Sequence, residues 1–337
     1  MANEEAPPLV TLPERVTLPE RVTVPEPGTV PESGIVPPER VGFIGLGNMG
    51  APMARRLAAA GYRLLVADAA PAAVERLRAE VKCEAPATLQ EIGASCRVVI
   101  TMLPDGHIVR KVLMGEGGVV AGLTAAGKPG AILIDMTSAS PVGTRALVTE
   151  LSALGLTLLD APVSGGVGRA VEGKLSIMVG GDAAVVTRCR PILDTMGQVF
   201  LTGAPGSGHA MKALNNFLSA INLAAAGEAV LAGQRFGLDP AKMIEIFNAS
   251  TGRNTGTDHK YPKFILPGTY NSGFAIGLMA KDLRLALELA RDSGVPAELL
   301  QTCVNMWSQA EGKLGARADN TEVVRYIESR VQGKSNG

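Results

Sequence analysis

The sequence is poor in aromatic residues, and it carries no excess of charge of either sign. Aromatic side chains make up 4% of the 337 residues, with one tryptophan. Lysine plus arginine and aspartate plus glutamate both number 32, and no long block of like charge occurs. Binding to nucleic acid requires a basic patch, so we expect no nucleic-acid partner. This composition favours a small-molecule ligand.

Disulfide pairing and membrane insertion are not indicated either. The four cysteines, Cys83, Cys96, Cys189 and Cys303, are scattered and form no CxxC pair, which is typical of reduced, structural thiols in the cytoplasm. The N-terminus lacks a cationic start followed by an apolar segment, and no uninterrupted apolar run reaches the roughly 18 residues of a membrane span. We expect a soluble, cytoplasmic protein without a membrane partner.

Proline is concentrated near the N-terminus. It recurs every six residues from Pro13 to Pro37 in TLPERVTLPERVTVPEPGTVPESGIVPPERV. Each repeat offers one or two apolar side chains, too few to offset the entropy lost on ordering. We predict that residues 1–36 form a disordered or polyproline-like tail that is dispensable, with a docking function as the alternative.

From Arg40 onward, short apolar runs alternate with alanine-rich stretches. The runs are RVGFIG, RLLVAD, CRVVITM, AILIDM, LTLLDAP, LSIMVGG and GQVFLTG. Apolar strands that alternate with helices indicate a parallel sheet buried on both faces. After Ala204 a periodic stretch continues to Phe236, and further helical segments start near Pro240, Phe274 and Pro296. We predict an α/β chain: a Rossmann-type, mostly parallel sheet domain over 37–203, joined by a long helix to an all-helical substrate and oligomerisation domain over 204–330.

The stretch VGFIGLGNMG carries the first motif with chemical meaning, a GxGxxG pattern between a predicted strand and a predicted helix. Its first glycine permits a tight turn, the second lets the backbone approach a pyrophosphate, and the third lets helix and strand pack closely. The helix N-terminus then faces the anion. The predicted dinucleotide-binding residues are Gly45, Leu46, Gly47, Asn48, Met49 and Gly50.

Three later strand ends should complete the cofactor crevice, because ligands of open α/β sheets collect at the carboxyl ends of strands. Asp68 lies eighteen positions after the third glycine, where an acid binds ribose hydroxyls and repels a 2′-phosphate. No arginine immediately follows it, so NAD is favoured over NADP; an ordinary loop aspartate is the alternative. TMLPDG and DMTSASP place Leu103, Pro104 and Ser138 at two such strand ends. The alternative is that these residues only form the turns between strand and helix.

A Ser-Gly-Gly turn follows a further strand in DAPVSGGVGRAVEGKL. The hydroxyl of Ser164 and the bare amides of Gly165 and Gly166 suit a carboxylate. A glycine-rich bend that binds nothing is the alternative.

The stretch GSGHAMKALNNF begins like a second fingerprint but has Met211 where the third glycine would stand. Lys212 and Asn216 lie one turn apart on the predicted long helix, with Asn215 beside them. Burial of this narrow polar face would lower the pKa of the lysine and suit it to proton transfer. The alternative for Lys212 is a solvated lysine on the surface. For Lys281 in KDLRLA, the alternative is likewise an ordinary surface charge.

Together, GFIGLGNMGAPMA, DAPVSGGVGRAVEGKLSIMVGG, GSGHAMKALNN and KDLRLA resemble, in order and spacing, the β-hydroxyacid dehydrogenase family over about residues 40–325. The resemblance implies that Lys212 is the general acid/base, that Asn216 orients the substrate, and that the turn at 164–166 binds its carboxylate. It also places Leu103, Pro104 and Ser138 against the nicotinamide and lets Lys281 reach cofactor or substrate. Asn215 stands where the 6-phosphogluconate branch has histidine, which disfavours decarboxylation.

The expected activity is NAD-dependent, reversible oxidation of a 3-hydroxy acid to its semialdehyde or keto acid. We expect a substrate similar to 3-hydroxyisobutyrate or a more polar analogue. The more polar analogue is considered because Arg253 and Asn254 stand where 3-hydroxyisobutyrate enzymes often have tryptophan. The three histidines have no metal-ligand spacing, so no metal is expected. An NADPH-dependent glyoxylate or succinic semialdehyde reductase and a non-catalytic cofactor-binding assembly protein are the alternatives. The resemblance implies a homodimer or homotetramer.

Overall fold

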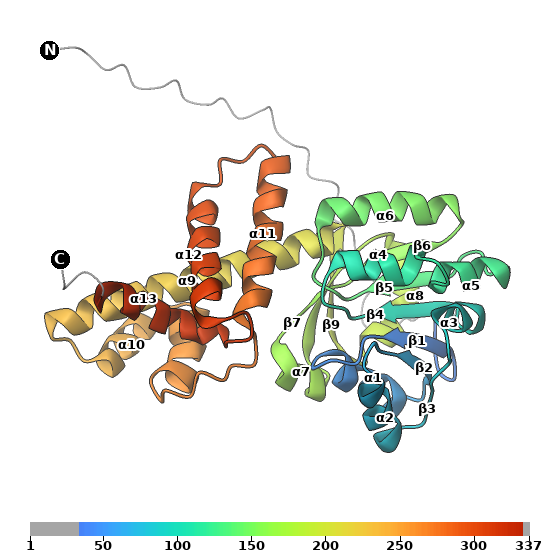
Figure 1. The fold of residues 1–337 in the computed structure, drawn as a ribbon, viewed down its shortest axis with the longest axis horizontal. Coiled ribbons are helices and arrows are strands. Elements are labelled where there is room, and N and C mark those ends of the chain that lie inside the picture. The colour runs from blue at the N-terminus through green and yellow to red at the C-terminus, as the bar shows by residue number, and fades with distance from the viewer. Residues whose placement is uncertain (1–33, 333–337) are drawn as a thin grey trace, which may run out of the picture.

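The computed structural model describes residues 34–332 as a sheet domain and a helical domain joined by one long helix (Figure 1). The predicted tail, residues 1–36, lies outside the described residues except for its last three positions. The last strand ends at Gly203 and the long helix begins at Ser207. The domain boundary at 203 and 204 stays a prediction.

Over residues 34–332 the sheet has nine strands. They are β1 (Arg40–Ile44), β2 (Arg63–Ala67), β3 (Cys83–Glu84), β4 (Val98–Thr101), β5 (Ile132–Asp135), β6 (Thr157–Asp160), β7 (Val163–Ser164), β8 (Leu175–Gly180) and β9 (Gly197–Gly203). The first six are parallel in the order β3-β2-β1-β4-β5-β6; β8 is antiparallel to β6 and to β7, and parallel to β9. The predicted Rossmann-type, mostly parallel sheet is confirmed. The two-residue strands β3 and β7 were not predicted, because they are too short to show a pattern.

Helices cover both faces of the sheet. The first layer contains α1 (Gly50–Ala59), α2 (Pro71–Glu80), α7 (Gly166–Glu172) and α8 (Ala183–Leu193), and the second α3 (Leu89–Ser95), α4 (Gly106–Met114), α5 (Val119–Ala125) and α6 (Pro141–Ala153). Successive strand residues point to opposite faces. Ile100 therefore packs in the first core and Val99 in the second.

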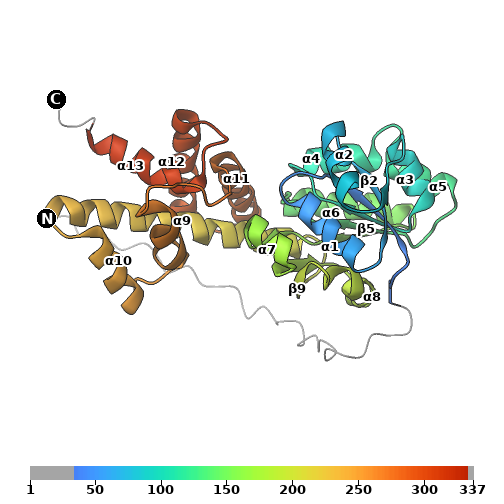
Figure 2. The ribbon, with the colours of Figure 1, turned by 90° about the horizontal axis from the view of Figure 1, so that it is seen from below.

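The C-terminal domain is helical, as predicted. It contains α9 (Ser207–Phe236), α10 (Pro240–Ala249), a π-helix η1 (Gly256–Ile265), α11 (Ile276–Asp292), α12 (Glu298–Leu314), a 3₁₀ turn η2 (Asn320–Glu322) and α13 (Val323–Gln332). Its core surrounds the fully buried Trp307, Tyr261 and Leu283. The other helices pack along α9, which extends from this core to the sheet (Figure 2).

The first turn of α9 is fixed to the sheet by the buried carboxylate of Asp160, at the end of β6. It accepts hydrogen bonds from the backbone N–H of Gly206 at 2.7 Å and of His209 at 2.9 Å. Gly206 has a φ of +86°, and a Cβ on Gly208 would lie 2.3 Å from the carbonyl oxygen of Met178 in β8. The two glycines therefore let α9 start in contact with the sheet.

Among the described residues, α9 is also the one helix with the length and hydropathy of a membrane span. One face of α9 packs within the fold, because Ala220, Leu223 and Val230 are buried in the helical core, whereas Leu214 and Leu218 on another face are exposed. Composition alone therefore does not separate this core helix from a membrane helix.

Candidate active site

The glycine-rich loop lies between the carboxyl ends of β1 and β4. Gly45 has a φ of +100°, and a Cβ at this position would lie 2.2 Å from the carbonyl oxygen of Met102. A Cβ on Gly50 would lie 1.9 Å from the carbonyl oxygen of Gly45, whereas one on Gly47 would meet no atom within 4 Å. Gly45 and Gly50 are thus required by the fold, and Gly47 leaves open space before the N-terminus of α1. That space fits the phosphates of a dinucleotide.

Asp68, at the end of β2, lies against the same loop. Its carboxylate accepts hydrogen bonds from the backbone N–H of Leu46 at 2.6 Å and of Ala70 at 2.7 Å. The side chain is half-buried, and it contacts the backbone between the first two glycines of the motif. The structure therefore brings Asp68 to the predicted dinucleotide site.

The ends of β4 and β5 are connected to each other and to the helical domain. The backbone N–H of Leu103 donates to Oγ1 of Thr137 at 3.0 Å. From α11, Nζ of Lys281 donates to the carbonyl oxygens of Pro104 at 3.1 Å and Ser138 at 2.7 Å. Leu103, Pro104 and Ser138, which are expected at the nicotinamide end, thus lie together with Lys281, which is expected to reach cofactor or substrate from the helical domain.

Lys212 and Asn216 are both buried, with exposed fractions of 7% and 5%. Burial lowers the pKa of Lys212, and the positive charge of Lys281 lowers it further, while the carboxylate of Asp282 opposes both. Nδ2 of Asn216 donates to Oδ2 of Asp282 at 2.6 Å. A partly desolvated amine next to an oriented amide suits proton transfer to or from a bound substrate.

The sequence alone favours surface charge for Asp282, next to Lys281, but the structure buries Asp282 in this group. It is 2% exposed, and its Oδ1 has no hydrogen-bond partner among the described residues but lies 3.4 Å from Nζ of Lys281. Its position on α11 could have been noticed, because Met279 and Ala286 place it on the apolar stripe of that helix. A carboxylate on such a stripe needs a polar partner.

The turn at Ser164 to Gly166 leads from β7 into the first residue of α7, which lies on the side of the sheet domain nearest the helical domain (Figures 1 and 2). Ser164 pairs with Ser176 of β8, and Gly165 and Gly166 are exposed with φ values of +131° and +71°. The glycines of the turn are therefore accessible to solvent.

Three other polar residues have separate roles. Asn215 is exposed and donates to Oδ1 of Asn216 at 3.3 Å, so it flanks the buried face. His209 is 1% exposed; its ring nitrogens contact Oγ1 of Thr144 at 2.7 Å and the carbonyl oxygen of Thr137 at 2.9 Å, which ties α9 to the sheet domain. Arg253 forms an exposed ion pair with Asp258 at 2.9 Å.

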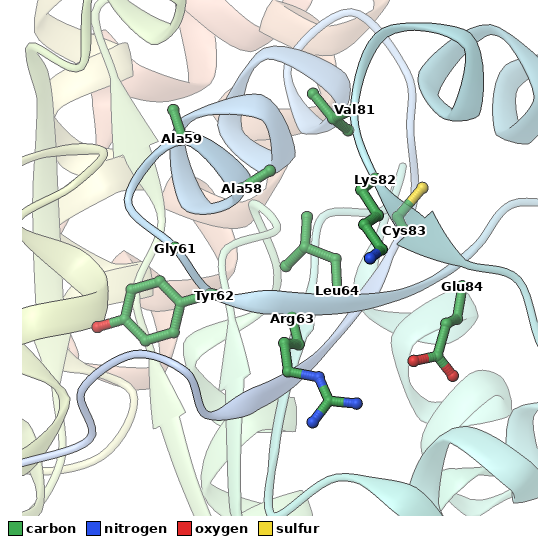
Figure 3. Close-up of a pocket in the computed structure, with 10 residues that line it drawn as sticks. All are labelled: Ala58, Ala59, Gly61, Tyr62, Arg63, Leu64, Val81, Lys82, Cys83 and Glu84. Carbon is green, nitrogen blue, oxygen red and sulfur yellow. The ribbon is translucent and has the colours of Figure 1, made fainter.

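A cavity of about 700 Å³ lies elsewhere, at the edge of the sheet beside β2 and β3 (Figure 3). Its lining includes Gly61 and Tyr62 before β2, and Val81 and Lys82 before β3. It thus opens near the amino ends of these strands, whereas the glycine loop and Asp68 follow the carboxyl ends. This cavity is separate from the candidate active site.

Comparisons with known proteins agree with this geometry. A family model described as the NAD binding domain of 6-phosphogluconate dehydrogenase matches residues 40–215. A second, described as NAD-binding of NADP-dependent 3-hydroxyisobutyrate dehydrogenase, matches residues 206–327. The two models together span both domains.

Similar proteins match over most of their length. The 3-hydroxyisobutyrate dehydrogenase of Pseudomonas aeruginosa is 40% identical over 286 residues, 83% of this chain and 93% of the relative. The 2-(hydroxymethyl)glutarate dehydrogenase of Eubacterium barkeri is 36% identical over 290 residues, 86% and 95% of the two chains. The structure of Mycobacterium tuberculosis 3-hydroxyisobutyrate dehydrogenase with L-serine superposes with a TM-score of 0.78 at 31% identity, covering 86% of this chain and 99% of that one. The chain therefore belongs to the β-hydroxyacid dehydrogenase family and is an NAD(P)-binding hydroxyacid dehydrogenase.

Proposed function

We propose that the protein reversibly oxidises a 3-hydroxy acid to its semialdehyde or keto acid with NAD, using Lys212 as the general acid/base. The observation that carries this proposal is the buried Lys212, with a lowered pKa, beside the Asn216–Asp282 pair. Desolvation increases the neutral fraction of an amine near pH 7, and a neutral amine accepts the proton of a hydroxyl group.

Each group of residues at the site has its own role in the proposed reaction. The turn from Ser164 to Gly166 binds the substrate carboxylate with its hydroxyl and backbone N–H groups. Asn216, which is hydrogen-bonded to Asp282, orients the substrate beside Lys212. Positioning of this kind lowers the activation barrier, because the entropy of bringing the reacting groups together is lost on binding. Nζ of Lys212 takes the hydroxyl proton in oxidation and returns it in reduction.

The cofactor-binding surface proposed here consists of the glycine loop, Asp68 and the ends of β4 and β5. When bound, the nicotinamide accepts a hydride from the carbinol carbon of the substrate. Asp68 favours NAD, because a carboxylate binds ribose hydroxyls and repels a 2′-phosphate. The proposed contacts are Gly45, Leu46, Gly47, Asn48, Met49, Gly50, Asp68, Leu103, Pro104, Ser138 and Lys281.

The alternative within the same family is an NADPH-dependent reductase of glyoxylate or succinic semialdehyde, which Asp68 disfavours. A non-catalytic assembly protein is disfavoured by the retained and buried Lys212. The predicted homodimer or homotetramer is supported by apolar side chains exposed along α9, at Met211, Leu214 and Leu218; sedimentation equilibrium of the intact chain tests it.

A panel of 3-hydroxy acids tests the activity through cofactor reduction at 340 nm. It includes 3-hydroxyisobutyrate, 2-(hydroxymethyl)glutarate and 3-hydroxypropionate, each with NAD and with NADP. We expect turnover of at least one acid and a higher kcat/KM with NAD. The absence of reduction with every acid and both cofactors would contradict the proposed activity.

The charges around Lys212 predict a pH dependence with a definite sign. In oxidation the amine must be neutral, so kcat rises with pH through the pKa of Lys212. Asp282 raises that pKa and Lys281 lowers it. Asp282→Asn should therefore move the midpoint of the kcat–pH profile to lower pH, and Lys281→Met should move it to higher pH. The profiles are measured at saturating cofactor and substrate, and shifts of the same sign in both variants would disprove Lys212 as the titrating group.

A further inference from the structure

A second buried lysine lies outside the proposed catalytic group. Lys212 and Lys260 are the two lysines buried in the part of the chain that the structure describes, and Lys260 is 9% exposed. The proposed proton transfer uses the first of them and leaves the second without a role. Lys260 belongs to the π-helix η1, which packs against α9. Departures from α-helical geometry of this kind occur frequently at functional sites.

Within residues 34–332, the hydrogen-bond partners of the Lys260 ammonium group are neutral side chains. Its Nζ donates to Oδ1 of Asn320 at 2.9 Å and lies 3.4 Å from Oγ of Ser219. Within residues 34–332, no carboxylate forms an ion pair with it. Burial lowers the pKa of Lys260 to about 8, and Asp319 opposes this shift through space.

Asp319 is not free to approach, because its carboxylate is already engaged. Its oxygens accept hydrogen bonds from the hydroxyl of Ser272, the backbone N–H of Gly273, and the backbone N–H and hydroxyl of Thr321. These contacts fix the loop that precedes η2. The positive charge on Lys260 thus lacks a carboxylate partner, and an unpaired ion in a protein interior costs several kcal/mol.

The position of Lys260 connects it to the reaction site. Its neighbour Ser219 lies on α9, three residues after Asn216 and on the same face as Lys212. Three residues of an α-helix correspond to about 4.5 Å along its axis. The ammonium of Lys260 is therefore about one helical turn beyond Asn216, on the side away from Lys212.

We propose that Lys260 binds a second anionic group of the substrate, and that the preferred substrate is a 3-hydroxy acid with an additional carboxylate. The proposal rests on the proposed function, since it assumes a 3-hydroxy acid reacting at Lys212. The carboxylate at the reactive end binds the turn at Ser164 to Gly166, and the distal one pairs with Lys260. An arriving carboxylate supplies the counter-charge that the folded chain does not provide.

The test compares a one-carboxylate with a two-carboxylate substrate in three proteins. Lys260→Met keeps the aliphatic length and removes the charge, and Lys263→Met is the matched control, an exposed lysine on the same helix. In the wild type we expect a lower KM for 2-(hydroxymethyl)glutarate than for 3-hydroxyisobutyrate. A charge-assisted hydrogen bond of about 1.5–3 kcal/mol corresponds to about 10–100-fold in affinity. Lys260→Met should raise the KM for the dicarboxylate by this factor, with kcat and the KM for 3-hydroxyisobutyrate nearly unchanged.

A binding measurement separates this inference from the proposed activity. Calorimetric titration of the NAD-loaded wild type with glutarate and with butyrate needs no turnover, and glutarate should bind more tightly through Lys260. Lys260→Arg should restore part of the preference if Lys260→Met abolishes it. Equal wild-type affinities for the two acids, or equal losses for both substrates in Lys260→Met, would refute the second anionic contact. Failure of both substrates to turn over, with the glutarate preference intact, would instead refute the proposed activity.

Discussion

Replacing Lys212 with alanine is expected to lower kcat by about 10²–10⁴-fold, the usual contribution of a general acid/base. The side chain is buried one turn after the helix start that Asp160 fixes to the sheet, so its amine is held at one place relative to the sheet domain. The two charged groups that act on its pKa are engaged with other groups: Oδ2 of Asp282 accepts from Asn216 and Oδ1 lies 3.4 Å from Nζ of Lys281, which donates to the loops after β4 and β5. We therefore expect neither of them to replace the amine as the base. The KM for the substrate should change much less than kcat.

Two further substitutions at this position control for packing. Lys212→Met fills the same volume without an amine and should lose as much activity as alanine, while Lys212→Arg keeps a charge that does not deprotonate in proteins. Circular dichroism and fluorescence titration with NAD should show a native fold and near-native cofactor affinity in all three variants. Near-native kcat in Lys212→Met would exclude Lys212 as the acid/base.

Replacing Asp68 with arginine is expected to reverse the cofactor preference from NAD to NADP. The native carboxylate accepts a hydrogen bond from the backbone N–H of Leu46 in the glycine loop, and the proposed function assigns it to the ribose of the cofactor. Loss of a charge-assisted hydrogen bond of about 1.5–3 kcal/mol predicts a 10–100-fold lower kcat/KM with NAD. The guanidinium should at the same time improve use of the 2′-phosphate of NADP.

Asp68→Asn is the matched control, because it keeps an oxygen that can accept from the N–H of Leu46 but removes the charge. Asp68→Asn should lower the ratio of kcat/KM with NAD to kcat/KM with NADP, but NAD should remain the preferred cofactor. Initial rates with varied NAD and NADP at saturating hydroxy acid give the ratio of kcat/KM with NAD to kcat/KM with NADP for each variant. Equal use of the two cofactors by the native protein would rule out the assignment of Asp68.

The elements that could be predicted are those whose pattern is local. Seven apolar runs mark the seven longer strands, and the periodic stretch ending before Gly237 marks α9. The two-residue strand β7 depends on its partner β8, and η1 contains Pro262, which a sequence pattern treats as a helix breaker. Neither feature is specified by its own few residues.

The same distinction holds within the candidate site. The glycine loop and Asp68 follow from a spacing within one βαβ unit, so they could be predicted. The contact between Asn216 and Asp282 joins residues 66 positions apart, and that between Lys260 and Asn320 joins residues 60 apart. The first contact arises when α11 packs against α9, and the second when η2 packs against η1, so no short stretch of sequence contains them.

The 30-residue helix α9 has a consequence for how the chain unfolds. Its first turn is hydrogen-bonded to Asp160 of the sheet domain, and its later turns carry Ala220 and Leu223 into the helical core. Neither body keeps its complete set of contacts if this helix melts, so the two should lose structure as one cooperative unit. A dinucleotide that binds only the native sheet domain stabilises that domain by mass action. Because the two domains unfold together, it then also stabilises the helical domain.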